Sequence, residues 1–407
     1  MKVGLYGRLG GGNIGNDAML DAVLDYLRKK RPDAELDFMC EGPEAITKRF
    51  GVPAVELHWM QSRKPARNRI VQKLLTLLRI GPAAIIDTWR TGRWVRRHDV
   101  VIIPGAGVLE ATLPQRPWEL PYSMLVMAVC GVLFGVKTAL VCVGGSRVEE
   151  PLIRYLLRSA ARMVTYRSFR DEYSLGVGRE TGVAKPQDRA YADLAFALPV
   201  ELARDPEPRS VGVGVMAYYG APTDRPRADA VHAEYVGQMC AFVRRLVDSG
   251  RSVRLLIGDA LDEEVAKAVV DDAQSYWTGS GPVPVSYQPF TSFDGLLDQV
   301  ASVQTVVAMR YHCVVAGLKL GRPTLAIGYG RKHDALMADM GLPQYVQDVR
   351  TLDLDRLVEQ VAELESLEPQ IIKTLAERAA DCRERLEEGF KDLDTALFTS
   401  TRTQVTR

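Results

Sequence analysis

Cysteine is scarce in this sequence of 407 residues, and none of the six cysteines belongs to a Cys-x-x-Cys pair. The scatter gives no zinc signature and no disulfide framework, and it predicts buried free thiols in a reducing compartment. A surplus of either charge is also lacking, because 52 Lys and Arg stand against 51 Asp and Glu. This balance excludes a global attraction to nucleic acid or to an anionic membrane, so we expect no nucleic-acid partner.

Long hydrophobic runs are nearly absent as well. The exception is 121–145, whose only charge is Lys137. A membrane span needs roughly 20 apolar residues, but the glycines inside this run and its strand-like end favour a buried helix over 122–134 and a buried strand over 137–143. The start of the sequence shows no apolar segment of signal-peptide length, so we expect a cytoplasmic protein.

Short apolar runs typical of buried parallel strands alternate with amphipathic helices along the whole chain. The expected strands cover 3–6, 36–40, 100–103, 139–143, 163–166, 190–192, 210–216, 253–257, 305–309 and 324–327. The proline-rich stretch 199–209 interrupts the alternation and is typical of a linker. The pattern predicts an α/β protein with two doubly wound, Rossmann-like domains facing a cleft, over 1–200 and 201–350, and a helical C-terminal tail over 351–407.

Glycine-rich turns follow three of the expected strands in the first domain. The first turn contains Gly12, Asn13, Gly15, Asn16 and Asp17. It fits G-x-G-x-x-G, whose glycines let the backbone approach a phosphate at a helix N-terminus. A structural strand-to-helix turn, with Asn16 or Asp17 capping the helix, explains the pattern equally well.

The second and third glycine turns strengthen this interpretation by their shared position. Gly105 and Gly107 follow the strand at 100–103, and Gly144 and Gly145 follow the strand at 139–143. Each could be an ordinary loop glycine. Together, however, turns at the carboxyl ends of parallel strands converge on one crevice, which predicts a ligand site there, for example for a phosphate.

Basic side chains stand just past two other strands. Arg170 follows the strand at 163–166, and a strand-end arginine suits a carboxylate or phosphate, although a helix capped by Ser168 explains the segment too. Arg310 and His312 follow the strand at 305–309, and both face one side if the strand geometry continues past its end, as an anion clamp beside an acid–base group. Lys332 follows the next strand and could complete the cationic pocket.

A basic block interrupts the first domain as an insertion over 61–98. Ten Lys and Arg between 63 and 98 mix with apolar residues and with Trp89 and Trp94, against Asp87 alone. A basic amphipathic segment with tryptophans can lie on an anionic membrane, which would place the protein at the inner face of the plasma membrane. The simpler explanation is a solvated helical insertion that covers the first domain.

Taken together, these motifs resemble those of the polysaccharide pyruvyl transferase family. The matching segments are 12–17, 168–174, 193–196, 310–312, 321–323 and 329–332. The family's Arg-Leu-His motif carries Tyr311 in place of leucine here. The aspartate that ends its G-N-I-G-D motif is replaced by Asn16, with Asp17 following. No counterpart of the basic insertion belongs to the family pattern.

The resemblance implies a GT-B-like fold and a defined reaction. Such enzymes transfer the enolpyruvyl unit of phosphoenolpyruvate to two hydroxyls of one sugar in a glycan or glycolipid precursor, giving a cyclic pyruvate ketal and phosphate. Arg310 and His312 would fall at the donor site, with His312 as the catalytic acid and Arg170 and Lys332 as further donor contacts. The first domain would then be the acceptor side, and neither metal nor cofactor would be required.

Three other functions compete with this one. A nucleotide-sugar-dependent glycosyltransferase on the same two-domain plan would use Arg310 and Lys332 to hold a diphosphate. A dinucleotide-dependent oxidoreductase would use the first glycine turn but leaves the Arg-Tyr-His motif unexplained. A non-catalytic protein of the membrane surface rests on the basic block alone. The sequence also admits a homo-oligomer without indicating one.

Overall fold

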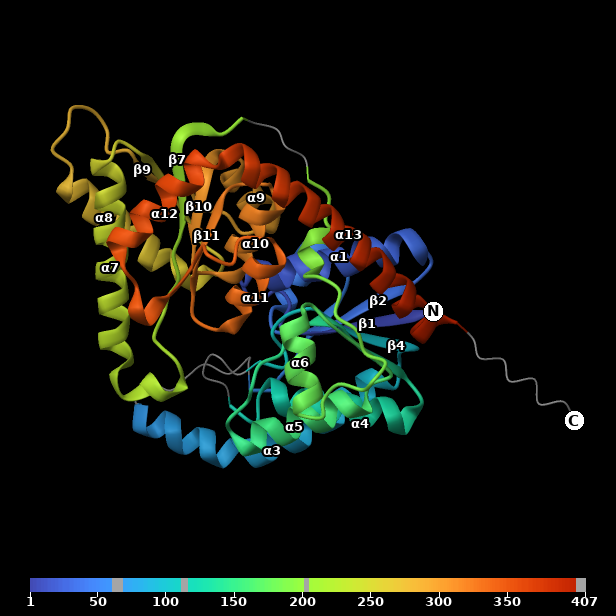
Figure 1. Ribbon diagram of the computed structural model, residues 1–407. Coiled ribbons are helices and arrows are strands. Elements are labelled where there is room, and N and C mark those ends of the chain that lie inside the picture. Colours follow the sequence, from blue (N-terminus) through green and yellow to red (C-terminus); the bar gives the residue numbers. More distant parts are fainter. Residues whose placement is uncertain (61–68, 111–115, 201–204, 400–407) are drawn as a thin grey trace, which may run out of the picture.

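Two parallel six-stranded sheets form the frame of the protein in the computed structural model (Figure 1). The structure describes residues 1–60, 69–110, 116–200 and 205–399, and the side chains of the inserted helix from Ile80 onward. The first sheet has the order β3-β2-β1-β4-β5-β6 and the second β12-β11-β10-β7-β8-β9. In the first sheet the strand order changes direction between β1 and β4, and in the second between β7 and β10. Doubly wound sheets bind their ligands at such a switch point.

The first domain contains the N-terminal sheet and its helices. Its strands are β1 (Lys2–Gly7), β2 (Glu35–Cys40), β3 (Ala54–Glu56), β4 (Val100–Pro104), β5 (Lys137–Val143) and β6 (Tyr166–Phe169). Its helices are α1 (Ile14–Lys30), α2 (Pro43–Phe50), α3 (Arg69–Val95), α4 (Leu120–Phe134), α5 (Pro151–Met163) and α6 (Glu172–Glu180), followed by the 3-10 turn η1 (Leu194–Ala197). In Figure 1, α1 lies on one side of the sheet and α3, α4 and α5 on the other.

The second domain repeats the plan. Its strands are β7 (Glu207–Gly214), β8 (Ser252–Leu256), β9 (Val285–Tyr287), β10 (Val303–Ala308), β11 (Thr324–Gly328) and β12 (Val346–Asp348). Its helices are α7 (Ala228–Asp248), α8 (Glu263–Tyr276), α9 (Phe293–Ala301), α10 (Tyr311–Lys319) and α11 (Arg331–Asp339), with 3-10 turns η2 (Pro222–Arg227), η3 (Ala260–Asp262) and η4 (Val349–Thr351). The predicted pair of Rossmann-like domains is therefore confirmed.

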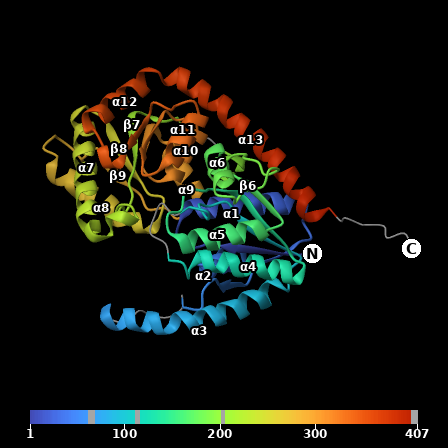
Figure 2. The ribbon, with the colours of Figure 1, turned by 60° about the horizontal axis from the view of Figure 1, so that its bottom comes forward.

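The helical tail consists of α12 (Leu354–Ser366) and α13 (Glu368–Phe398). α12 packs on the second domain, whereas α13 crosses back to the first and contacts η1, β5 and β6 (Figure 2). Tyr26 stacks on Phe390 with ring centroids 4.4 Å apart, and Arg31 forms an ion pair with Asp394 at 2.7 Å. The tail thus contacts both domains and connects them on one side of the molecule.

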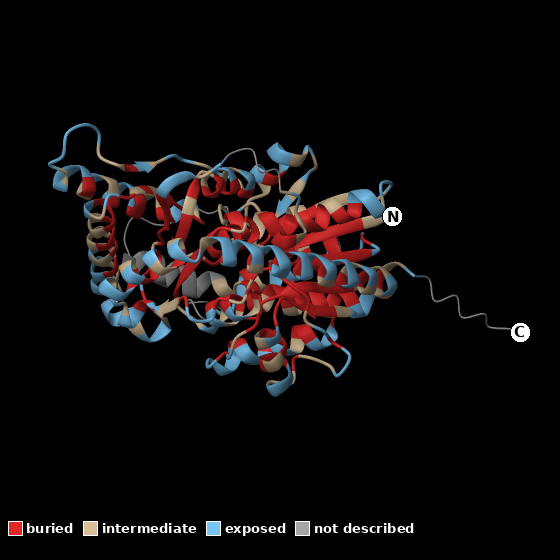
Figure 3. Cartoon of the chain, turned by 45° about the horizontal axis from the view of Figure 1, so that its top comes forward, coloured by how far each residue is buried: buried red, intermediate tan, exposed pale blue. Residues whose placement is uncertain are grey.

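The core occupies the sheets and the helix faces turned toward them (Figure 3). All five residues of β4 are buried, as expected for a strand covered on both faces. The apolar run 121–145 forms α4, closed by Gly135 in the left-handed conformation (φ 69°), and then β5. In the described part of the chain, no helix is long and apolar enough to cross a membrane.

Two expected strands differ from the structure. The strand predicted at 163–166 lies at Tyr166–Phe169, because Met163 still belongs to α5. The hydrophobic pattern missed the true position of this strand because the strand contains polar residues. Arg167 is buried within it and is paired with Asp188. The strand predicted at 190–192 is a single bridge between Ala190 and Phe169.

Candidate functional site

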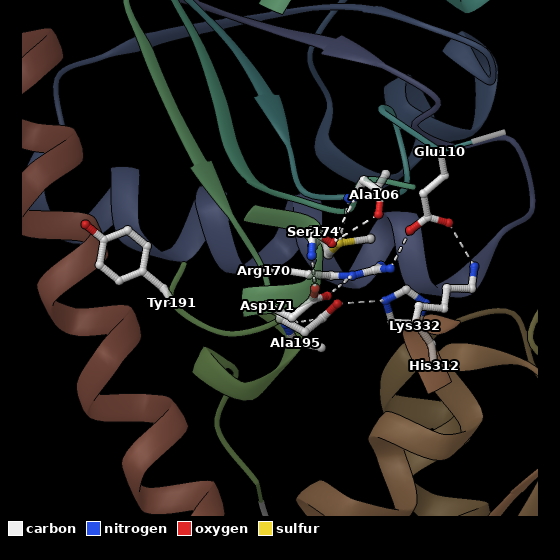
Figure 4. A network of polar contacts seen from close by, with 12 residues as sticks. Ala106, Glu110, Arg170, Asp171, Ser174, Tyr191, Ala195, His312 and Lys332 are labelled. Carbon is white, nitrogen blue, oxygen red and sulfur yellow. Dashed lines mark hydrogen bonds and ion pairs between the residues drawn. The ribbon is translucent and has the colours of Figure 1, made fainter. Parts of the chain in front are cut away.

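A polar cavity of about 170 Å³ lies where the carboxyl ends of both sheets meet. The residues that line it come from both domains and include Arg8, Asn13, Asn16, Gly107, Glu110, Arg170, Arg310, Tyr311, His312, Tyr329 and Lys332. Four side chains expected at a donor site, Arg170, Arg310, His312 and Lys332, are therefore brought together. Figure 4 shows three of them: Arg170 and Lys332, both joined to Glu110, and His312 close by.

Arg310 is held by one carboxylate of its own domain. It is the N-cap residue of α10, directly after β10, and its Nε and Nη2 donate to the two carboxylate oxygens of Asp262 at 2.8 and 2.6 Å. Asp262 is fully buried and also accepts from the amides of Ala217 and Gly258. This bidentate pair fixes the plane of the guanidinium at the cavity wall.

Glu110 joins cations of the two domains. It accepts from Nη2 of Arg170 at 2.5 Å and from Nζ of Lys332 at 3.0 Å. Burial works to raise the pKa of the Glu110 carboxyl, but the charges of Lys332 and Arg170 outweigh it and hold the pKa at about 2. Arg170 also contacts Asp171 at 3.2 Å, so the cluster contains two cations and two carboxylates.

The ring of Tyr311 lies against both cations, Arg170 and Lys332. The Arg170 guanidinium lies 4.2 Å and the Lys332 ammonium 5.7 Å from its centroid. Lys332 also lies 4.7 Å from the ring of Tyr329. Aromatic faces attract cations electrostatically, so the tyrosine that replaces the leucine expected between Arg310 and His312 has a definite place in the cluster.

His312 lies in the first turn of α10 and turns toward the first domain. Its Nε2 is 3.6 Å from Oδ2 of Asp193, which immediately precedes η1. Burial works to raise the pKa of Asp193, but the nearby His312 outweighs it and the pKa is lowered. Neither Nε2 of His312 nor Oδ2 of Asp193 has a hydrogen-bond partner among the described residues. At this distance the buried carboxylate of Asp193 orients the imidazole by its charge and forms no hydrogen bond with it.

The strand geometry that would make Arg310 and His312 face one side does not continue past β10. The strand ends at Ala308, and the chain turns into a helix at Tyr311 instead of continuing extended. Arg310 therefore points to Asp262 and His312 to Asp193, while both still line the cavity.

The first glycine turn connects the domains. Its bridge to Asp259 is antiparallel: the amide of Ile14 donates to Gly258 and the amide of Ala260 donates to Gly12. Asn13 donates to Asp259 from its side chain at 3.2 Å and caps the amide of Asn16 at 3.1 Å. The amides of Ile14 and Asn16, at the start of α1, are thus already engaged, which weakens the dinucleotide interpretation.

The remaining loop residues divide into two groups. Asn13, Asn16 and Gly107 line the cavity. Gly12 (φ 92°) and Gly105 (φ 51°) adopt left-handed turns beside it, and Asp17 accepts from the amide of Gly10 at 2.8 Å. Gly15 packs directly on His312: a Cβ at this position would lie 1.9 Å from Nδ1 of the imidazole.

Sequence reasoning missed the carboxylates that position the cations. Glu110, Asp193 and Asp262 were not among the expected site residues, and Arg8 was missed as well. Two signals were available: Glu110 follows the second glycine turn, and Asp193 opens the 193–196 motif. Within the described residues, no three His, Cys, Asp or Glu side chains gather to hold a metal.

Three comparisons place this architecture among known proteins. A family model for polysaccharide pyruvyl transferase matches residues 13–331. No curated protein sequence matches the chain. Among solved structures, the UDP-GlcNAc 2-epimerase from Neisseria meningitidis bound to UDP-GlcNAc is 11% identical with a TM-score of 0.61, covering 97% of this chain and 99% of that one.

Two further structures share the fold. The lipopolysaccharide outer core galactosyltransferase WaaB in its apo form is 14% identical with a TM-score of 0.54, covering 98% of this chain and 99% of that one. MurG from Acinetobacter baumannii is 12% identical with a TM-score of 0.53, covering 97% and 99%. At these identities the likeness concerns the two-domain fold alone.

Proposed function

Because this chain belongs to the polysaccharide pyruvyl transferase family, we propose that it transfers the enolpyruvyl unit of phosphoenolpyruvate to two hydroxyls of a sugar. The products are a cyclic pyruvate ketal and phosphate. The sugar belongs to a glycan or glycolipid precursor. No cofactor enters this reaction, since phosphoenolpyruvate is the donor substrate.

One observation carries the proposal: Arg170, Arg310 and Lys332 line a single small cavity together with His312. Phosphoenolpyruvate presents a carboxylate and a phosphate on the same carbon, and guanidinium and ammonium groups suit both anions. Asp262 engages only Nε and Nη2 of Arg310, so the guanidinium keeps further donors for a ligand. The buried cations would also stabilise phosphate as it departs.

His312 is the proposed acid. It gives a proton to the methylene carbon of phosphoenolpyruvate, which makes the neighbouring carbon electrophilic. One sugar hydroxyl adds to that carbon, phosphate leaves, and the second hydroxyl closes the ring. The two hydroxyls release two protons, of which one replaces the proton given by His312 and one leaves with phosphate.

Asp193 is a positioning residue in this scheme. Its carboxylate faces Nε2 of His312 across 3.6 Å and stabilises the imidazolium from the side of the first domain. Asn13, Asn16 and Arg8 line the opposite wall and offer the polar groups that a sugar requires. We therefore propose the first domain as the acceptor side and the second as the donor side.

Ligand binding to the full chain tests the donor. Thermal unfolding is followed with phosphoenolpyruvate, UDP-glucose, GDP-mannose and NAD, each at saturating concentration. A ligand at 100 times its Kd stabilises a protein by about 2.7 kcal/mol, which is visible as a rise in Tm. We expect phosphoenolpyruvate to raise the Tm of the wild type and to lose this effect in Arg310→Gln.

Arg251→Gln is the matched control for that variant. Arg251 forms a bidentate pair with Glu365 at 2.8 and 2.7 Å, much like Arg310 with Asp262, but it lies away from the cavity. Its variant should keep the full response to phosphoenolpyruvate. Phosphate release is then measured with a panel of sugars that carry neighbouring free hydroxyls. Normal phosphate release by both His312→Ala and His312→Gln would contradict the proposed acid.

A nucleotide-sugar glycosyltransferase is the second candidate. It is favoured by the shared fold of WaaB, a galactosyltransferase, and of an epimerase that binds UDP-GlcNAc. In that case Arg310 and Lys332 would hold a diphosphate. A Tm shift with a nucleotide sugar and none with phosphoenolpyruvate would replace the first proposal by this one.

A further inference from the structure

Large apolar side chains lie exposed on the outer layer of the first domain, formed by α3, α4 and α5. These helices pack side by side, α3 on α4 and α4 on α5 (Figure 2). Trp89 on α3 is 64% exposed, Leu133 on α4 is 70% exposed and Tyr155 on α5 is 65% exposed. The same three helices also carry exposed Ile85, Val132, Phe134, Leu152 and Met163.

The charge on the bodies of these helices is predominantly positive. From residue 80 of α3 onward, and throughout α4 and α5, the only acidic residue is Asp87. Asp87 is buried and occupied, since it accepts from the amide of Trp59 at 2.8 Å and from Arg90 at 3.2 Å. The exposed ionic side chains on these helices and in the two residues after α3 are Arg93, Arg96, Arg97, Arg154, Arg158 and Arg162. Exposed acidic residues stand only at the ends of this layer, with Asp99 after α3 and Glu149 and Glu150 before α5.

Arginines and apolar residues are interleaved on this face. The guanidinium of Arg93 lies 5.6 Å from the ring of Trp89, and that of Arg96 lies 5.9 Å from the ring of Phe134. Between α3 and α4 runs an open groove of about 700 Å³, lined by these four side chains, Arg97 and Leu133. The net charge of the whole chain is only +1, so the positive charge of this layer is a local feature.

We infer that the outer face of α3, α4 and α5 docks the protein on an anionic phospholipid surface. Tryptophan, tyrosine and aliphatic side chains partition into the interface of a bilayer, and arginines pair with its phosphates. A second copy of the chain is a poorer occupant, because a two-fold contact through this face would set arginines against arginines. The inference is independent of the proposed donor.

The structure also revises the segment expected to touch a membrane. Trp94 is buried and unavailable, whereas α4 and α5 contribute most of the exposed apolar residues. The basic residues of 63–68, and the side chains up to 79, lie outside the described residues.

Vesicle sedimentation with the full chain tests the inference. We expect binding to phosphatidylcholine vesicles that contain about 30% phosphatidylglycerol, little binding to pure phosphatidylcholine, and weaker binding at about 0.5 M salt. The double variant Trp89→Ser/Leu133→Ser removes apolar contacts. The triple variant Arg154→Gln/Arg158→Gln/Arg162→Gln removes charge. Each should lower the partition coefficient about tenfold or more.

Matched variants on other faces serve as controls. Ile372→Ser replaces an exposed apolar residue of α13, and Arg225→Gln/Arg378→Gln replaces exposed arginines of η2 and α13. Both should bind vesicles like the wild type, and all variants should keep the wild-type Tm.

Equal binding by wild type and face variants, or no preference for anionic lipid, would overturn the inference. So would a wild-type dimer in light scattering that the same variants dissociate, with no vesicle binding.

Discussion

At the scale of the residue, Gly15 decides where His312 can lie. A methyl group at Gly15 would meet Nδ1 of the imidazole at 1.9 Å, so Gly15→Ala must displace the ring from the position it holds beside Asp193. A misplacement of about 1 Å can cost about 100-fold in rate, and we expect a loss of that order in phosphate release. The proposed binding of phosphoenolpyruvate to Arg170, Arg310 and Lys332 should change only a few-fold.

Gly237→Ala is the control for this substitution. Gly237 lies inside α7 with open space around it, so alanine should be tolerated and can stabilise the helix by up to about 1 kcal/mol. Unchanged phosphate release in Gly15→Ala would show that the position of His312 is not critical.

A second residue-scale prediction concerns acid stability. His333 is fully buried, with Nε2 3.0 Å from the carbonyl of Met309 and Nδ1 3.3 Å from that of Gly330. Burial, reinforced by the charge of Lys332, lowers its pKa to about 3. Below a pH of about 6.5, the ordinary pKa of histidine, His333 binds a proton in the unfolded chain but not in the folded chain. The free energy of unfolding therefore decreases as the pH is lowered, by up to about 1.4 kcal/mol per pH unit.

Denaturant unfolding between pH 6.5 and 4.5 measures this loss. His333→Gln should flatten the fall of the unfolding free energy with decreasing pH. His58, whose pKa burial lowers to about 4, adds a contribution of the same sign, so His58→Gln should flatten the curve as well. If the slope of His333→Gln equals that of the wild type, the histidine is protonated in the folded chain.

The basic residues of the cavity could be found in the sequence, but the carboxylates that pair with them could not. Arg310, His312 and Lys332 follow apolar strands and belong to short motifs, so position along the chain is informative. Asp262 and Glu110 lie 48 and 222 residues away from the side chains they hold, Arg310 and Lys332. Only the approach of loops in space creates these pairs, and a single sequence carries no record of it.

At the scale of the element, α10 is fixed at both ends. Arg310 and His312 anchor its N-terminus, and Lys319 anchors its C-terminus by donating to the carbonyls of Phe196 and Leu198 at 3.2 and 2.6 Å. Burial lowers the pKa of Lys319 to about 8. The helix is thereby tied to the segment around η1, which also supplies the carboxylate of Asp193.

Lys319→Met should loosen this anchor. Methionine fits the apolar surroundings but leaves two carbonyls without their donor, at a cost of about 1–3 kcal/mol in the free energy of unfolding. Hydrogen exchange should rise in α10 and around η1. Lys373→Met, on the exposed face of α13, should change neither quantity. Unaltered exchange in α10 would mean that Lys319 does not hold the helix.

The long elements were predictable and the short ones were not. The strands at β1, β4, β5, β8 and β10 are apolar runs whose burial on both faces leaves a clear pattern. β3, β9 and β12 have only three residues each and lie at sheet edges, where pairing with a neighbour defines the strand more than its own sequence. The prediction placed β6 three residues too early, because an arginine in a sequence is expected to be exposed. Arg167 is buried only because it pairs with Asp188, which the sequence does not show.

At the scale of the whole molecule, Glu110 links the domains through charge. It belongs to the first domain and binds Lys332 of the second. Glu110→Gln would leave Arg170 and Lys332 close together without their carboxylate, and breaking a buried pair costs about 3–5 kcal/mol. We expect a lower Tm that inorganic phosphate or phosphoenolpyruvate restores to a larger extent than in the wild type, because an added anion replaces the lost charge.

Glu365→Gln is the comparison for this variant. It breaks the ion pair with Arg251 inside the second domain, away from the cavity, so it should lower the Tm without any special response to phosphate. A phosphate response of equal size in Glu110→Gln and the wild type would argue against anion binding between these cations.

The return of α13 to the first domain also sets an order of events during synthesis. Tyr191 donates to Asp392, 201 residues later, and Tyr26 donates to Asp394, 368 residues later. During translation, the surface of the first domain that α13 covers, around η1, β5 and β6, therefore stays uncovered until the entire second domain has been synthesised. The contacts of Tyr26 and Tyr191 with α13 therefore form last, after both sheets have been synthesised.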